Sequence, residues 1–283
     1  MNLPAQLTPP LNVTERIVFF LHVHKCGGSH ICHLAQHHHH IADDGFDKMR
    51  NCNPLGQGPW TYLDGQWGAG NALDSDGEQM YAASAAKHWR FLATEVVLRH
   101  LNTQRYRYAT QLRTPISRML SHMRHERHDM KAISSWVFEN SSARSAAPLP
   151  LTAHFGMEVL RGPIPYDNTF VRMLGGPEVF TRASGNVSAG DFERAREALD
   201  HFDIVIILEE YDIHAAPQLA LLGWNEFLHK NQLRHAGGRS VLSTGFRRRL
   251  EELNVFDYKL YDHAKGRAKQ ITTCARRRRW FPC

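Results

Sequence analysis

A lysine, two glycines and a serine follow the first strongly apolar segment of the chain. That segment, residues 17–24, is rich in β-branched and aromatic side chains and predicts a buried strand. The next residues form a turn, and residues 30–40 are expected to continue as a helix. The turn consists of Lys25, Cys26, Gly27, Gly28 and Ser29. Because backbone N–H groups at a helix N-terminus bind phosphate oxygens, this unit predicts an anion site, in which Lys25 adds a positive charge and Ser29 a hydroxyl.

The glycine turn alone is compatible with two interpretations. Gly27 and Gly28 let the backbone approach an anion closely, but an ordinary strand-to-helix turn that binds nothing also uses glycines. The segment lacks the G-x-x-x-x-G-K-[ST] spacing of a Walker A motif and the G-x-G-x-x-G spacing of a dinucleotide-binding turn. A second feature is therefore needed to decide between a site and a plain turn.

A second strand–loop–helix unit follows further along the chain. Residues 106–112 alternate like a strand, and Pro115 suits the first turn of the helix expected over residues 116–127. Arg113 then lies at the end of a strand, where ligands bind in open α/β sheets, and Ser121 lies along the helix. We expect the planar guanidinium of Arg113 and the hydroxyl of Ser121 to hold one phosphate together.

These two segments, in this order, resemble the nucleotide-binding motifs of sulfotransferases that use 3′-phosphoadenosine 5′-phosphosulfate (PAPS). Residues 25–29 resemble the loop that binds the 5′-phosphosulfate, which often reads H-x-x-K-x-G-G-T. Residues 113–121 read R-T-P-x-x-R-x-x-S and resemble the 3′-phosphate motif R-[DN]-P-x-x-R-x-x-S. Cys26 replaces the usual Thr, and Thr114 replaces the usual Asp or Asn. The resemblance implies an enzyme that transfers the sulfuryl group of PAPS to a hydroxyl of an acceptor.

Later segments resemble the Golgi glycan-sulfating branch of that family, which includes the heparan sulfate 2-O- and 6-O-sulfotransferases. Residues 168–174 resemble its N-x-x-x-R-x-L helix, residues 203–212 its late core strand and following helix, and residues 254–264 its C-terminal helix. The resemblance implies a glycan or a small molecule as acceptor, with carbohydrate sulfation in the Golgi as the setting. It places the nucleotide against Lys25, Cys26, Gly27, Gly28, Ser29, His30, Arg113, Ser121 and Arg172.

Sulfuryl transfer needs a base for the acceptor hydroxyl and a positive charge near the leaving oxygen, which we assign to Lys25. In the glycan-sulfating relatives the base usually lies between the two nucleotide motifs, where this chain has His88 and Glu95. We prefer His88, because an imidazole with a pKa of about 6.5 suits proton abstraction at neutral pH, and we keep Glu95 as the rival. Alternatively, His88 is a solvated strand-edge residue, and Glu95 is a helix-start residue or a buried partner of Arg113.

Strands that alternate with helices predict an α/β fold with a parallel sheet. A third strand, residues 202–208, is so apolar that we expect it at the centre of the sheet. The resemblance implies a P-loop-like three-layer fold, with a central parallel sheet flanked by helices. Residues 89–101 are expected to hold a short strand that leads into a helix. Further helices are expected over residues 133–140, 168–174, 188–201, 211–222 and 246–265.

The whole chain, residues 1–283, is expected to form a single sulfotransferase domain. It would carry an extended lead-in (1–15), an irregular insertion (43–80) and a basic tail (266–283). No apolar run reaches the 18 residues that a membrane-spanning helix needs, so no span is expected. No signal peptide is visible, and we expect the Golgi lumen if an N-terminal anchor belongs in front of this chain, and the cytoplasm otherwise.

The charge and the cysteines exclude some classes of protein. A net charge of +6 favours anionic partners, which include nucleotides, acidic glycans, nucleic acid and anionic membranes, and it does not choose among them. From the resemblance we expect neither a nucleic-acid partner nor a metal cofactor. Five cysteines without a C-x-x-C pair fit neither a zinc ribbon nor a dense disulfide framework; one disulfide or free thiols are both compatible with them.

Two other functions stay open at this point. A P-loop-like nucleotide kinase also binds phosphates through a glycine turn, but the chain has no Walker A motif and no clear Mg²⁺-binding Asp after a strand. A non-catalytic anion-binding module would account for the basic charge. Charge alone, however, does not require Lys25 to be followed by Arg113 and Ser121 in this order.

Overall fold

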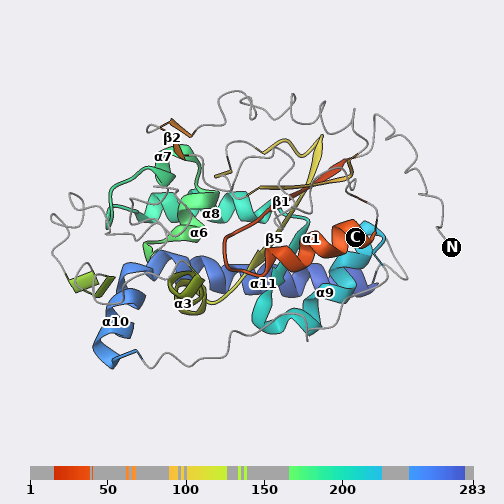
Figure 1. Ribbon diagram of the computed structural model, residues 1–283. Coiled ribbons are helices and arrows are strands. Elements are labelled where there is room, and N and C mark those ends of the chain that lie inside the picture. Colours follow the sequence, from red (N-terminus) through yellow and green to blue (C-terminus); the bar gives the residue numbers. More distant parts are fainter. Residues whose placement is uncertain are drawn as a thin grey trace.

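The computed structural model describes the parts of the chain that build one parallel sheet and its helices (Figure 1). The described residues are 16–38, 40, 62–63, 66–67, 89–94, 97–98, 101–125, 133–134, 137–138, 166–224 and 242–277. Four parallel strands form the sheet in the order β4-β1-β5-β6. They are β1 (Ile17–Leu21), β4 (Phe91–Thr94), β5 (Tyr106–Leu112) and β6 (Ile204–Ile207).

Helices make up most of the remaining described structure. They are α1 (Gly28–His37), α3 (Pro115–His125), α6 (Thr169–Leu174), α7 (Pro177–Phe180), α8 (Ala189–Asp200), α9 (Tyr211–Leu219), α10 (Thr244–Leu253) and α11 (Val255–Arg277). Two 3₁₀ turns, η2 (Leu208–Glu210) and η3 (Ala220–Leu222), precede and follow α9. Within the expected irregular insertion, a short antiparallel ladder joins β2 (Tyr62–Leu63) to β3 (Gln66–Trp67).

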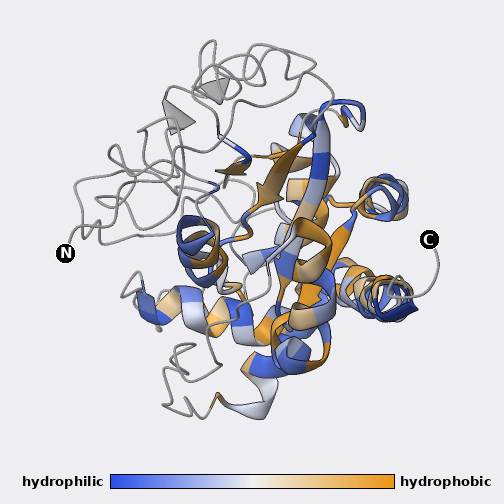
Figure 2. Ribbon diagram, turned by 90° about the vertical axis from the view of Figure 1, so that its right-hand side faces the viewer, coloured by the Kyte–Doolittle hydropathy of each residue, from blue (hydrophilic) through white to orange (hydrophobic). Residues whose placement is uncertain are grey.

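Alternate residues of the strands belong to two separate cores, one on each face of the sheet. On β1, Ile17, Phe19 and Leu21 pack with residues of α6, α7, α8 and α11. Val18 and Phe20 pack with residues of α1 and α9. Figure 2 shows the hydrophobic strands at the centre, between helices whose outer faces are hydrophilic. The predicted α/β fold, with a central parallel sheet flanked by helices, is confirmed.

The prediction that the third strand lies at the centre of the sheet is wrong. Among the described strands, β6 pairs with β5 alone and forms an edge. It is apolar because α9 and α11 cover its two faces. On its open edge, the side-chain amide of Gln218 accepts from the N–H of Val205 and donates to its carbonyl, both at 2.8 Å. A glutamine of α9 therefore satisfies the backbone groups that a further strand would otherwise pair with.

The C-terminal helices differ from the prediction. The sequence predicts one helix over residues 246–265, but the structure has α10 and α11, separated at Asn254. The Asn254 amide donates to the carbonyls of Leu250 and Tyr166, at 2.8 and 2.7 Å, and so ends α10. α11 then continues to Arg277, so much of the expected basic tail (266–283) is helix. Its apolar side, which includes Ala268 and Ile271, belongs to the core.

Several other elements agree with the prediction. β5 covers residues 106–112 as expected. α8 begins after Ser188, whose hydroxyl accepts from the N–H of Asp191 while the Asp191 carboxylate accepts from the N–H of Ser188, a reciprocal capping box. α1 ends at His37, earlier than the predicted residue 40. The expected lead-in (1–15) lies outside the described residues.

No helix in the described ranges has both the length and the apolar character that crossing a membrane requires. Cys32 and Cys274 are disulfide-bonded, whereas Cys26 is a buried free thiol.

Candidate functional site

The glycine turn and Arg113 lie at the same edge of the sheet because their strands are neighbours. β1 and β5 are parallel, with Leu21 opposite Thr110, and the Thr110 hydroxyl donates to the Leu21 carbonyl at 2.9 Å. The segments that leave the two strands therefore start side by side at the carboxyl-terminal edge, where ligands bind in open α/β sheets. The structure thus brings residues 25–29 and Arg113 to one place.

The glycine turn has a backbone that depends on its glycines. Lys25 and Gly27 both have positive φ angles, 67° and 88°, and α1 begins at the next residue, Gly28. A Cβ on Gly27 would overlap the side-chain amide of Gln111, and one on Gly28 would overlap the imidazole ring of His22. The two glycines therefore let the turn lie directly against the ends of both strands. The N–H groups of Gly28 and Ser29, the first two residues of α1, precede the hydrogen-bond ladder of the helix and are directed out of its N-terminus.

Gln111 fastens this turn to β5. Its side-chain amide donates to the carbonyl of Cys26 at 2.6 Å, and the side chain is completely buried. Gln111 was not predicted as a site residue. A signal for its role is that an uncharged polar side chain near the end of a strand needs a hydrogen-bond partner when it is buried.

Cys26 belongs to the turn, and its buried side chain is a neutral thiol. Burial raises its pKa to about 12, and the positive charges of Arg118 and Arg113 only partly oppose that rise. Cys26 is therefore not a thiolate nucleophile.

Arg118 is the second arginine of the R-T-P-x-x-R-x-x-S segment, and its side chain is fully buried. Its guanidinium lies over the ring of Phe170, 6.0 Å from the centroid. Desolvation lowers its pKa, and the Asp257 carboxylate acts in the opposite direction. Arg118 thus places a positive charge below the turn, in the interior and not on the ligand side.

Arg113 and Ser121 differ from Arg118 in being partly exposed. Arg113 precedes α3, and Ser121 lies on that helix beyond the buried Arg118. These exposures leave the two predicted phosphate ligands accessible to a molecule outside the core. On α3, the partly exposed Ser121 is therefore available for binding, whereas the buried Arg118 holds the helix in place.

A carboxylate holds the start of α3. Glu209, in η2, accepts from both the backbone N–H and the hydroxyl of Thr114 through one oxygen, each at 3.0 Å. Its other oxygen accepts from the hydroxyl of Tyr261 at 3.0 Å. Burial and the negative charge of Glu209 raise the pKa of Tyr261. Thr114 is therefore bonded to a carboxylate in the turn that follows β6, whereas the resembled motif carries an Asp or Asn at the position of Thr114 itself.

The side chain of His30 has a structural place. Its Nε2 lies 2.8 Å from the Tyr211 hydroxyl, and its ring packs edge-on against that phenol. Burial, with a smaller contribution from His33, lowers the pKa of His30 to about 4, so the imidazole is neutral. Its backbone N–H is occupied by the Gly27 carbonyl. His30 joins α1 to α9, and we therefore remove it from the predicted nucleotide contacts.

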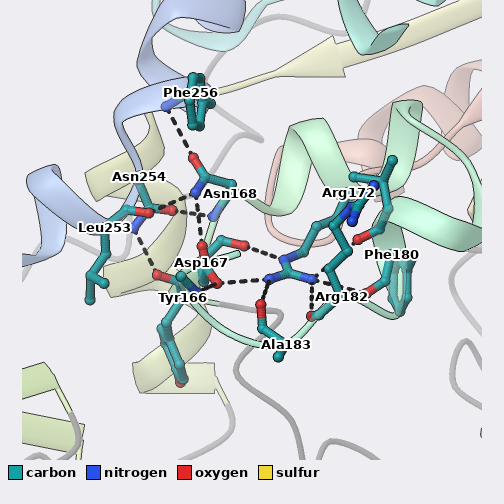
Figure 3. A network of polar contacts seen from close by, with 12 residues as sticks. Tyr166, Asp167, Asn168, Arg172, Phe180, Arg182, Ala183, Leu253, Asn254 and Phe256 are labelled. Atoms are coloured by element: carbon teal, nitrogen blue, oxygen red, sulfur yellow. Dashed lines mark hydrogen bonds and ion pairs between the residues drawn. The ribbon is translucent and has the colours of Figure 1, made fainter. Parts of the chain in front are cut away.

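Arg172 is also removed from the predicted nucleotide site. Figure 3 shows its guanidinium surrounded by acceptors from the chain that follows α6. It donates to the carboxylate and carbonyl of Asp167, both at 2.7 Å. It also donates to the carbonyls of Val179, Phe180, Arg182 and Ala183. With both partners of the ion pair fully buried, Arg172 organises the protein interior and has no surface for a ligand.

The asparagine before α6 belongs to a reciprocal arrangement beside that network. The side-chain oxygen of Asn168 accepts from the N–H groups of Phe256 and Asp257, both at 3.1 Å, at the start of α11 (Figure 3). In return, the Asp257 carboxylate accepts from the N–H groups of Phe170 and Val171, at 3.1 and 3.0 Å, at the start of α6. The segments 168–174 and 254–264 thus cap each other's helices: Asn168 caps the start of α11, and Asp257 caps the start of α6.

Both candidate bases, His88 and Glu95, lie outside the described residues, so their roles stay predictions. Near the glycine turn the structure shows a group of imidazoles instead. The ring of His24 packs edge-on against His122 and His125, with centroids 5.2 and 5.6 Å away. Across the described ranges, no group of three or more His, Cys, Asp or Glu side chains is arranged to hold a metal ion.

Comparison with known proteins gives no match, either to a protein-family model or to a curated protein. The function of the protein is therefore inferred from the residues of the site itself.

Proposed function

We propose that this protein is a sulfotransferase that transfers the sulfuryl group of PAPS to a hydroxyl of a glycan or a small molecule. The observation that carries the proposal is the pairing of two strand–turn–helix units on the adjacent parallel strands β1 and β5. One unit supplies the glycine turn with Lys25, and the other supplies Arg113 and Ser121. A nucleotide with phosphates at both its 5′ and 3′ positions has one anionic group for each unit.

The glycine turn suits the 5′-phosphosulfate. The N–H groups at the start of α1 provide donors to the phosphate oxygens, and the dipole of the helix favours negative charge there. Gly27 and Gly28 keep side chains out of this space, while Gln111 and His22 support the turn from below. Such a site is rigid before the ligand arrives, which reduces the entropy lost on binding.

The second unit suits the 3′-phosphate. Arg113 has a planar fork of donors that matches two phosphate oxygens, and Ser121 adds a hydroxyl from α3. The bonds from Thr114 to Glu209 fix the start of that helix. This phosphate does not react, so these residues would determine which nucleotide binds and not how fast it reacts.

In the proposed reaction the acceptor oxygen attacks sulfur and the bond from sulfur to the phosphate oxygen breaks. The electron pair goes to the departing adenosine 3′,5′-bisphosphate, and the acceptor's proton goes to the base, for which His88 and Glu95 stay the candidates. Lys25 would meet the negative charge that develops on the leaving oxygen. Because that charge is greater in the transition state than in the bound substrate, this contact raises the rate.

The disulfide-bonded Cys32 and Cys274 support an oxidising compartment, such as the Golgi lumen, over the cytoplasm. An oxidising lumen is also where glycan acceptors are modified in the resembled branch.

The test of the proposal is sulfuryl transfer itself. Sulfur-labelled PAPS is incubated with the protein, in the presence of EDTA, and with pools of glycans or small hydroxyl compounds. We expect label to move to at least one pool, and to do so less with a Lys25→Ala variant. Absence of label transfer to every pool, with γ-phosphate transfer from ATP in its place, would favour a kinase instead.

A further inference from the structure

A cleft opens at the opposite edge of the sheet from the glycine turn. Its volume is about 440 Å³, and it lies where β5 and β6 begin. Because all four strands run away from this edge, the length of the sheet separates a molecule bound here from the glycine turn. The cleft is thus a separate location from the proposed PAPS site, and its argument does not depend on that proposal.

Three arginines reach this cleft from three different parts of the fold. Arg16 precedes β1, Arg107 lies on β5 and Arg267 lies on α11. Two carboxylates, Asp200 and Asp203, line the same cleft. Guanidinium groups therefore outnumber carboxylates.

The two carboxylates are held mainly by groups other than these arginines. Asp200 accepts from His263 at 2.7 Å and from Arg196 at 3.3 Å. Asp203 accepts from the backbone N–H of Tyr108 at 3.1 Å. Their ion pairs with the arginines of the cleft are long, at 4.0 Å. Much of the negative charge is thus already satisfied, and the positive charge of the cleft is only partly neutralised.

Arg107 is the most available of the three cations. Its Nη1 donates to the Leu221 carbonyl at 3.1 Å, and among the described residues no carboxylate forms an ion pair with it. A guanidinium has five N–H donors, so most of those of Arg107 remain for a ligand. Arg107 is only partly exposed, which strengthens its interaction with an anion relative to a fully solvated side chain.

The remainder of the lining is suited to an organic body. Phe202, Ile204 and Ile271 are buried and form an apolar floor, and Gln270 adds a polar group from α11. The volume lies in the range of clefts that hold small organic molecules. We propose that this cleft binds a sugar-sized molecule with one sulfate or phosphate ester, whose oxyanion pairs with Arg107 while its body covers the apolar floor.

The test uses four probes that share a hexose ring: glucose 6-sulfate, glucose 6-phosphate, glucuronate and neutral glucose. Binding to the full chain is measured by isothermal titration calorimetry, for the wild type, Arg107→Gln and the control Arg248→Gln. Arg248 is a highly exposed arginine of α10 that pairs with Glu252 on the same helix and does not line the cleft. We expect at least one ester to bind more tightly than glucose. The affinity for that ester should fall about ten-fold or more in Arg107→Gln, which corresponds to the loss of a charge-assisted hydrogen bond. It should be unchanged in Arg248→Gln.

The proposal is overturned if neither ester binds more tightly than glucose, or if Arg107→Gln binds the ester as well as the wild type does. Tighter binding of glucuronate than of both esters would also contradict it. If Arg107→Gln fails to fold, Gln270→Glu replaces it, because this exposed helix position accepts a carboxylate that repels an anion from the cleft. An unchanged ester affinity in Gln270→Glu would then refute the proposal.

Discussion

The carbonyl of Cys26 accepts a hydrogen bond of 2.6 Å from the side-chain amide of Gln111. This bond joins the turn after β1 to the end of β5, two residues before Arg113. The two motifs that the proposal assigns to opposite ends of one nucleotide are therefore parts of one connected unit. A change in the packing of the glycine turn should be felt at Arg113 as well.

Gly28→Ala tests the packing of the turn. The added methyl group would overlap the His22 ring, so we expect a loss of about 1–3 kcal/mol in the free energy of unfolding, typical of overpacking, together with weaker nucleotide binding. Urea denaturation and calorimetry measure the two effects. Gly266→Ala is the matched control, because a Cβ there meets nothing and an alanine within α11 should stabilise by about 0.5–1 kcal/mol. Equal stability of Gly28→Ala and the wild type would contradict this account of the turn.

Lys25 and Arg113 should affect different kinetic constants. We expect Lys25→Ala to lower turnover about 10²–10³-fold, as for loss of a group that stabilises transition-state charge, with a smaller effect on nucleotide binding. Arg113→Ala should mainly weaken nucleotide binding, because the 3′-phosphate does not react. Steady-state kinetics with PAPS and calorimetry with adenosine 3′,5′-bisphosphate separate the two. A loss of binding alone in Lys25→Ala would show that this lysine is not at the reacting centre.

The sequence was sufficient to predict the order of β1, α1, β5 and α3 and the edge at which the glycine turn and Arg113 meet. Local signals explain this success: an apolar strand, a glycine pair and Pro115 each act within a few residues. The position of β6 was mispredicted because an edge strand covered on both faces by helices is as apolar as a central one. Its open edge is satisfied by Gln218, a contact that no strand pattern reveals.

The side-chain roles were harder to predict than the elements. Arg172 and His30 occur in segments that resemble nucleotide-binding ones, but the partners that bury them, Asp167 and Tyr211, are set by tertiary packing. Glu209 was noted only as part of a resembling segment. Its bonds to Thr114 depend on β6 lying next to β5, and that neighbour relation was not predicted.

Arg172→Met should be a stability variant and not a binding variant. Removing one partner of a buried ion pair leaves the Asp167 carboxylate uncompensated, so we expect a loss of about 3–5 kcal/mol in the free energy of unfolding. The nucleotide affinity of the protein that remains folded should be unchanged. Arg194→Met, which removes an exposed pair with Glu178, is the control and should cost little. A stable Arg172→Met variant that no longer binds nucleotide would return Arg172 to the site.

His30 predicts a pH dependence of stability. Burial lowers its pKa to about 4 in the folded protein, against about 6.5 in the unfolded chain. Between these values the unfolded chain binds a proton that the folded protein does not, so this contribution to stability is complete above pH 6.5 and is lost as the pH falls towards 4. His30→Gln should therefore show a smaller loss of stability than the wild type across that window, measured by urea denaturation at several pH values. Parallel pH profiles for the two proteins would contradict a neutral buried His30.

The most direct test of the central claim is calorimetric titration of the full chain with adenosine 3′,5′-bisphosphate and with 5′-AMP, in EDTA. The two nucleotides differ in the 3′-phosphate that Arg113 and Ser121 are proposed to hold. We predict that the bisphosphate binds more tightly than 5′-AMP, and that Arg113→Ala removes most of the difference while leaving the binding of 5′-AMP nearly unchanged. Equal affinities of the wild type for the two nucleotides would contradict the account, because the second motif would then recognise no 3′-phosphate.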